Sequence, residues 1–110
     1  MSEYGFQGMP PFNAFKQFIP ENELYLTSPS VKNHQKHPVG YETIEAYMER
    51  EYRIPEKFED YIYVSQLLQA KGMQIAIEAH RRNRPYCMGT LFWQLNDCWP
   101  VISWSSVDYY

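Results

Sequence analysis

The residues with the clearest chemical potential lie near the end of the chain, where residues 88–110 contain all three tryptophans. Trp93, Trp99 and Trp104 alternate there with amide, carboxylate and hydroxyl side chains. Flat indole faces stack on the C–H faces of a sugar ring, and fixed polar groups bind its hydroxyls. This stretch therefore predicts a carbohydrate-binding surface.

We do not expect all of the tryptophans and their polar neighbours to contact a sugar. We expect Trp93 to face the ligand. For Trp99 and Trp104, ligand contact and packing stay equally open, because tryptophan is largely buried on average. Two roles stay open for Asp97, since aspartate in a loop often accepts backbone N–H groups instead of binding a ligand. The candidate substrate-binding residues are Trp93, Asn96, Asp97, Trp99 and Trp104.

The composition argues against several other functions. The chain has 110 residues, of which 45% are hydrophobic and 17% aromatic, which is typical of a folded protein rich in ligand-binding or interface side chains. Its formal net charge of −3 offers no basic surface, which argues against nucleic acid as a partner. No apolar run approaches the roughly 18 residues that suggest a membrane span.

The elements that must position these residues follow from the spacing of apolar side chains. The run that leads into the tryptophans is nearly continuous in apolar residues, which is typical of a strand buried on both faces. The predicted elements are a strand at 1–7, helices at about 12–19, 41–52 and 56–83, a strand at 88–95 and an active-site loop at 96–110. The order strand, helices, strand indicates a βαβ-type unit of the α/β class.

A long polar connection at residues 20–40 separates the first two predicted helices. His34 and His37 have a spacing that suits a metal site, but no third ligand lies nearby and the flanking lysines repel a cation. A solvated loop is the preferred interpretation, with a contact to the ligand left open because loops of this length are often functional.

Two motifs extend this interpretation to a family. The sequence FWQLNDCWP at residues 92–100, continued by SWSS at 103–106 and DYY at 108–110, resembles the last barrel strand of the β-mannosidases of glycoside hydrolase family 2. The sequence SEYGFQ at residues 2–7 resembles the seventh-strand motif of the same family. With the helix-rich segment between the two motifs, the resemblance covers essentially the whole chain.

The resemblance implies both a fold and a chemistry. The chain would be a fragment of a catalytic (β/α)₈ TIM barrel, from about strand seven to the loop after strand eight, because a complete barrel needs about 250 residues. Glu3 stands where the family has its catalytic nucleophile, and Trp93 would line the subsite for the terminal mannose. The implied enzyme is a retaining exo-glycosidase that hydrolyses terminal β-linked mannose from oligosaccharides without a metal or an organic cofactor.

The second catalytic carboxylate that this mechanism needs has no counterpart in the sequence. A retaining glycosidase places two carboxyl groups about 5–5.5 Å apart. In this family the acid/base glutamate follows an asparagine at the end of a strand, whereas Asn22 and Glu23 lie in the polar connection. We therefore expect the isolated chain to be inactive.

Other interpretations stay open at this point. A β-galactosidase, β-glucuronidase or glucosaminidase of the same family would share the fold, and a non-catalytic carbohydrate-binding module would use the aromatic surface alone. Strands outside a complete barrel have unpaired edges, so we expect the isolated chain to self-associate. The sequence does not determine the compartment; the family resemblance implies the periplasm or secretion in bacteria and the lysosome in animals.

Overall fold

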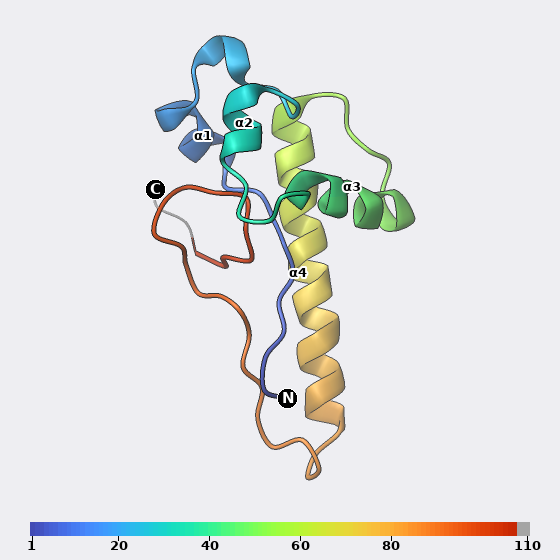
Figure 1. Cartoon of the computed structure of the whole chain (residues 1–110). Helices are drawn as coiled ribbons and strands as arrows, with labels where there is room; N and C mark the ends of the chain where they lie inside the picture. Colours follow the sequence, from blue (N-terminus) through green and yellow to red (C-terminus); the bar gives the residue numbers. More distant parts are fainter. Residues whose placement is uncertain (108–110) are drawn as a thin grey trace.

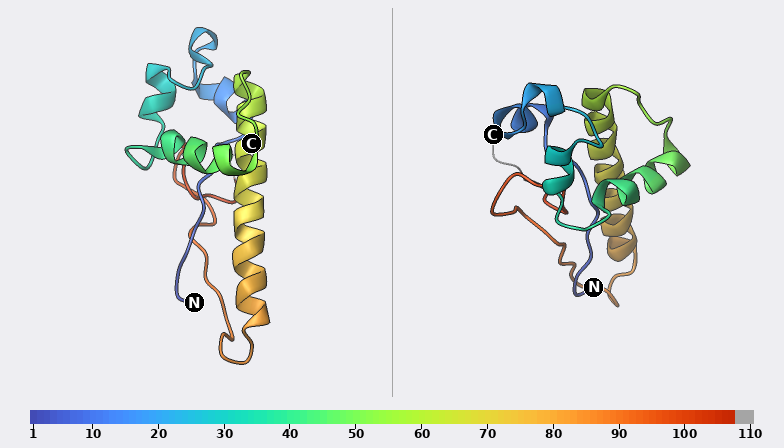
Figure 2. Two further views of the ribbon diagram at one scale, coloured as in Figure 1. Left: turned by 90° about the vertical axis from the view of Figure 1, so that its right-hand side faces the viewer. Right: turned by 45° about the horizontal axis from the view of Figure 1, so that its top comes forward.

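In the computed structural model, which describes residues 1–107, a run of helices lies between two extended segments. Helices α1, α2 and α3 gather around the N-terminal half of the long helix α4 (Figure 1). The extended segments at residues 1–7 and 88–95 run beside the C-terminal half of α4 (Figures 1 and 2). The elements are α1 (Phe12–Phe18), the 3-10 helix η1 (Glu21–Glu23), α2 (Pro29–Asn33), α3 (Gly40–Glu51) and α4 (Phe58–Arg82).

The expected fold class, an α/β fragment of a (β/α)₈ TIM barrel with strands at 1–7 and 88–95, is wrong. Residues 1–107 contain no strand and no sheet, only two isolated bridges, Gly8 with Ser103 and Gln35 with Ile102. The two extended segments lie side by side, and the Trp93 N–H donates to the Tyr4 carbonyl at 2.6 Å. A single amide bond of this kind is not a ladder, and a strand exists only where a partner continues the hydrogen-bond pattern.

The burial of the second extended segment also differs from the prediction. A strand buried on both faces was expected there, but Met88 and Leu91 are each 67% exposed. A strand buried on both faces needs elements packed against each face. The exposure of Met88 and Leu91 shows that the described residues do not cover this segment, so its apolar character alone did not make it a strand. The last residues of the predicted active-site loop, 108–110, lie outside the described part of the chain.

The helices begin and end where local chemistry favours it. The long helix α4 has Glu59 and Asp60 in its first turn and basic residues in its last turn, and both charges complement the helix dipole. The predicted helices at 12–19, 41–52 and 56–83 correspond to α1, α3 and α4.

Helices α2 and η1 occupy the connection that was expected to be a loop. The Ser28 hydroxyl caps α2 by accepting the Val31 N–H at 3.1 Å, and Pro29 stands in the first turn. The Glu23 carboxylate of η1 accepts the Ser30 N–H at 3.0 Å, which links the two short helices.

One core joins all four α-helices to the C-terminal loop. Phe15, Val31, Met48 and Ile62 are fully or almost fully buried, and Ile102 of the loop, at 0% exposure, belongs to the same cluster. The loop is held there by two backbone bonds, from the Ile102 N–H to the His34 carbonyl at 2.8 Å and from the Lys36 N–H to the Ile102 carbonyl at 3.0 Å.

A membrane-spanning helix needs both length and a mainly apolar surface, and none of the described helices has both.

Replacement of Ile102 tests whether the loop is part of the core. We expect Ile102→Ala to lower the free energy of unfolding by about 2–5 kcal/mol, because a buried isoleucine leaves a cavity. The matched variant Ile75→Ala removes the same atoms from a residue that is 57% exposed, and its effect should stay within about 0.5 kcal/mol. Urea unfolding of the purified proteins measures both values; equal effects would contradict the packing described.

Candidate functional site

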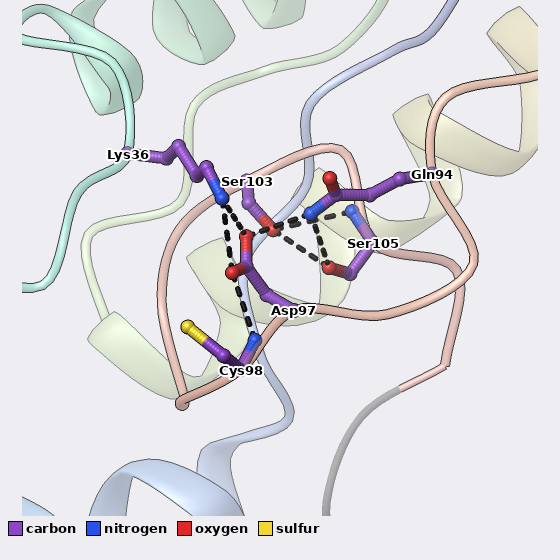
Figure 3. Close-up of polar contacts among 6 residues, drawn as sticks. All are labelled: Lys36, Gln94, Asp97, Cys98, Ser103 and Ser105. Carbon is purple, nitrogen blue, oxygen red and sulfur yellow. Dashed lines mark hydrogen bonds and ion pairs between the residues drawn. The ribbon is translucent and has the colours of Figure 1, made fainter.

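A buried carboxylate organises the C-terminal loop. Asp97 is 8% exposed and accepts the Lys36 ammonium at 3.0 Å on Oδ1 and 2.8 Å on Oδ2 (Figure 3). The Cys98 N–H donates to Oδ1 at 2.9 Å, and the Gln94 amide donates to Oδ2 at 2.7 Å. One carboxylate thus joins the loop to a lysine from a different part of the chain.

The protonation of this carboxylate follows from its contacts. Burial acts to raise the pKa of Asp97, but the hydrogen bonds from Lys36, the Cys98 N–H and Gln94 together hold the pKa below its usual value of 3.8. The same contact with Asp97 raises the pKa of Lys36. The two groups therefore form an ion pair throughout the neutral range, with the carboxylate side buried and the lysine side chain 41% exposed.

Gln94 fastens the start of the loop to its far end. The Gln94 N–H donates to the Trp104 carbonyl at 3.1 Å, and its own carbonyl accepts the Ser106 N–H at 3.1 Å. Its side-chain amide also donates to the Ser105 hydroxyl at 3.2 Å, and that hydroxyl contacts the Ser103 hydroxyl at 2.9 Å (Figure 3). The loop is therefore closed by polar contacts at the residue that directly follows Trp93.

Trp99 belongs to an aromatic stack that the sequence did not suggest. The His34 ring lies between Trp99 and Phe18, with ring centroids 4.5 and 4.6 Å away. The ring nitrogen Nδ1 of His34 is 2.8 Å from the Pro100 carbonyl. The interpretation of His34 as part of a solvated loop is therefore wrong, because its ring is half-buried between two elements that are distant in sequence.

Glu3 and Trp93 come from segments that touch at the backbone. The Trp93 N–H donates to the carbonyl of Tyr4, the residue next to Glu3. A Cβ atom at Gly5 would lie 2.2 Å from the Trp93 carbonyl oxygen and 3.0 Å from the Trp104 ring, so only glycine permits this approach. The side chains of Glu3 and Trp93 are both exposed.

The predicted site residues therefore fall into two groups. Glu3, Trp93 and Trp104 come from neighbouring backbone, whereas Asp97 and Trp99 line a cavity of about 460 Å³ against α4. Asn96, which stands between Trp93 and Asp97 in the sequence, is exposed. Within residues 1–107 no group of three His, Cys, Asp or Glu side chains could hold a metal ion.

Sequence reasoning missed the residues that hold the loop in place. Lys36 was considered only as a charge that repels a metal, and Gln94, Ser103 and Ser105 were not selected as site residues. The partners lie 61 positions apart in the case of Lys36 and Asp97. The only available signal was the density of hydroxyl and amide side chains within the tryptophan-rich loop.

Comparisons with known proteins agree with the motifs. No family model matches the sequence. The β-mannosidase B of Aspergillus terreus is 35% identical over 113 residues, which cover 99% of this chain and 13% of that protein. The β-mannosidase B of Thermothelomyces thermophilus is 35% identical over 120 residues, covering 100% of this chain and 14% of the relative.

A solved structure shows the same similarity in three dimensions. The crystal structure of a β-D-mannosidase from Dictyoglomus thermophilum matches with a TM-score of 0.95 at 40% identity, over 100% of this chain and 14% of that chain. The chain therefore spans about one seventh of the length of the proteins that it matches. These matches confirm the resemblance drawn from the two motifs.

The ion pair of Asp97 gives a stability prediction with a defined pH dependence. We expect Asp97→Asn to lower the free energy of unfolding at neutral pH by about 1.5–3 kcal/mol, since it removes a buried, charge-assisted hydrogen-bond acceptor. A carboxylate with a lowered pKa stabilises the protein above its unfolded pKa and loses that effect as pH falls through its folded pKa. The difference between wild type and variant should therefore shrink below about pH 3.8.

The surface ion pair between Lys71 and Glu51 provides the matched control. Both of its side chains are more than 40% exposed, so Glu51→Gln should change the free energy of unfolding by less than about 1 kcal/mol. Denaturant unfolding between pH 2.5 and 8 measures all three proteins. A difference for Asp97→Asn that does not depend on pH would contradict the ion pair as its cause.

Proposed function

Because this chain corresponds over its whole length to one segment of the β-mannosidases, we propose that it forms part of the sugar site of a retaining exo-glycosidase of glycoside hydrolase family 2. The full-length protein that carries this segment would remove terminal β-linked mannose from oligosaccharides. In this proposal Glu3 is the nucleophile and Trp93 is the aromatic wall against which the mannose ring stacks.

The observation that carries the proposal is the contact between the two motif segments. The motif with Glu3 and the motif with Trp93 are 90 positions apart in the sequence, yet the Trp93 N–H donates to the Tyr4 carbonyl. The absence of a side chain at Gly5 allows this approach. Glu3 and Trp93 are both exposed on segments that touch at the backbone, which supports a site in which a sugar reaches both side chains.

The proposed reaction has two steps. A carboxylate oxygen of Glu3 forms a bond to the anomeric carbon of the mannose while the bond from that carbon to the glycosidic oxygen breaks. An acid/base carboxyl group gives its proton to the leaving oxygen. In the second step the same group takes a proton from water, the water oxygen bonds to the anomeric carbon, and the Glu3 carboxylate is released.

Glu23 does not suit the acid/base role. A general acid needs a raised pKa, whereas hydrogen bonds from Ser30 lower the pKa of Glu23. The helix η1 that carries Glu23 also lies at the opposite end of the molecule from the N-terminus (Figures 1 and 2). In our proposal the acid/base therefore comes from a part of the full-length protein outside this segment.

Replacement of Glu3 in the full-length protein tests the nucleophile. We expect Glu3→Gln to reduce kcat for nitrophenyl β-mannoside by at least about 1,000-fold, because the amide cannot attack the anomeric carbon. A 2-deoxy-2-fluoro-β-mannoside with a good leaving group should label the wild type on the peptide that contains Glu3, detected by mass spectrometry. The fluorine slows both steps, so the glycosyl-enzyme accumulates.

The control for this experiment is Glu21→Gln, another exposed glutamate, which lies in η1. It should keep the activity of the wild type. Intact turnover by Glu3→Gln, or label on a different carboxylate, would sink the nucleophile assignment. A preference for nitrophenyl β-galactoside over β-mannoside would change the proposed substrate and leave the proposed mechanism in place.

The 110-residue chain by itself should not hydrolyse the mannoside. A retaining mechanism needs two carboxyl groups, and we assign only one to this segment. Purified chain at micromolar concentration should release nitrophenol no faster than buffer, while the full-length protein does so readily. Turnover by the isolated chain that disappears in Glu3→Gln would show that the second carboxyl lies within these residues after all.

A further inference from the structure

We propose that Lys36 is a positioning residue for the sugar-facing indole of Trp93, and that it acts through Asp97 and Gln94. This inference rests on the function proposed above, because it assumes that Trp93 contacts the sugar. Lys36 itself has no assigned contact with a substrate. Its effect on a sugar would come from the geometry of the loop that begins directly after Trp93.

The first step is the fixed position of Lys36. Its N–H donates to the Ile102 carbonyl, and Ile102 is a fully buried member of the core. The backbone of Lys36 is thus tied to the helical half of the molecule, and its ammonium extends from there to both oxygens of Asp97 (Figure 3). A charge whose own backbone is held by a hydrogen bond to the core places its partner more accurately than a charge on a free loop.

The second step leads from Asp97 to Trp93. Asp97 Oδ2, which Lys36 contacts at 2.8 Å, also accepts the Gln94 amide at 2.7 Å. The backbone of Gln94 is in turn bonded to Trp104 and Ser106 on the other side of the loop. Gln94 and Trp93 share a peptide bond, so the position of Gln94 fixes the carbonyl side of the Trp93 backbone. The Tyr4 carbonyl, which accepts the Trp93 N–H, fixes the other side.

The third step concerns the charge. The Asp97 side chain is 5% exposed, so removal of Lys36 would leave an anion buried without its counter-ion. Such an anion is costly, and the protein relieves the cost when the carboxylate takes up a proton or moves toward water. Either change alters the acceptor that the Gln94 amide contacts. The position of Trp93 therefore depends on a lysine from the loop between α2 and α3.

The experiment uses a double-mutant cycle in the full-length protein. We expect Lys36→Met to lower kcat/KM for nitrophenyl β-mannoside on the order of 10- to 100-fold, as a misplaced binding wall does. In a Trp93→Ala background the same substitution should change kcat/KM less than about twofold, because the group that Lys36 positions is already absent. Lys36→Arg, which keeps the charge, should recover most of the activity.

Binding gives the same cycle without turnover. In a Glu3→Gln background, titration calorimetry with nitrophenyl β-mannoside should show that Lys36→Met weakens the Kd when Trp93 is present and not in Trp93→Ala. Glu51→Gln, on the surface ion pair, is the control and should change neither quantity. All measurements are made well below the melting temperature of each variant, so that a loss of folded protein does not enter.

The outcomes separate this inference from the proposed function. Equal losses from Lys36→Met with and without Trp93, or no loss at all, would overturn the positioning role while Glu3→Gln stays inactive. Full turnover by Glu3→Gln would overturn the proposed function, and the inference with it. Coupling between Lys36 and Trp93 in both kcat/KM and Kd, with recovery by Lys36→Arg, would support the inference.

Discussion

The contact between Lys36 and Asp97 is the interaction on which the C-terminal loop, residues 94–107, depends. Residues 94–107 have no helix or strand to fix their path, so isolated backbone bonds and side chains together satisfy their backbone groups. Asp97 does so for the Cys98 N–H and fixes the amide of Gln94, which closes the loop on Ser105. The buried carboxylate stays ionised in this place because Lys36 neutralises it and the Cys98 N–H and the Gln94 amide donate to it.

The helices and the site differ in how far the sequence determined them. The helices at α1, α3 and α4 correspond to the predicted ranges because apolar spacing and terminal charges act within one segment. A strand is different, because it exists only with a hydrogen-bonded neighbour. Residues 88–95 are as apolar as a strand should be, but in the described chain their backbone bonds are one from Trp93 to Tyr4 and a few that join Gln94 and Leu95 to the loop, none of which forms a ladder. The sequence of residues 88–95 alone does not show whether a neighbouring strand is present.

The same distinction explains which site contacts the sequence revealed. Of the two roles left open for Asp97, acceptance of a loop N–H is present in the structure, and it is a contact between adjacent residues. Trp99, which stacks on His34, and Asp97, which pairs with Lys36, lie more than 60 positions away in the loop, so neither pattern nor spacing indicated these contacts. The identification of Glu3 and Trp93 came from motif resemblance, and their assigned roles stay predictions.

The two halves of the chain are stabilised by different forces, and this difference bears on the proposed site. The helical half has its own apolar core, in which Phe15 and Met48 are fully buried. The extended segment at residues 88–95 has none: Leu91 and Leu95 are more than 60% exposed, and so is Met88. Where the burial of apolar side chains contributes little, a few polar contacts determine the position of the segment, and the loss of any one of them displaces it more. The segment proposed to bind the sugar is therefore the part of this chain most sensitive to the loss of a single charge.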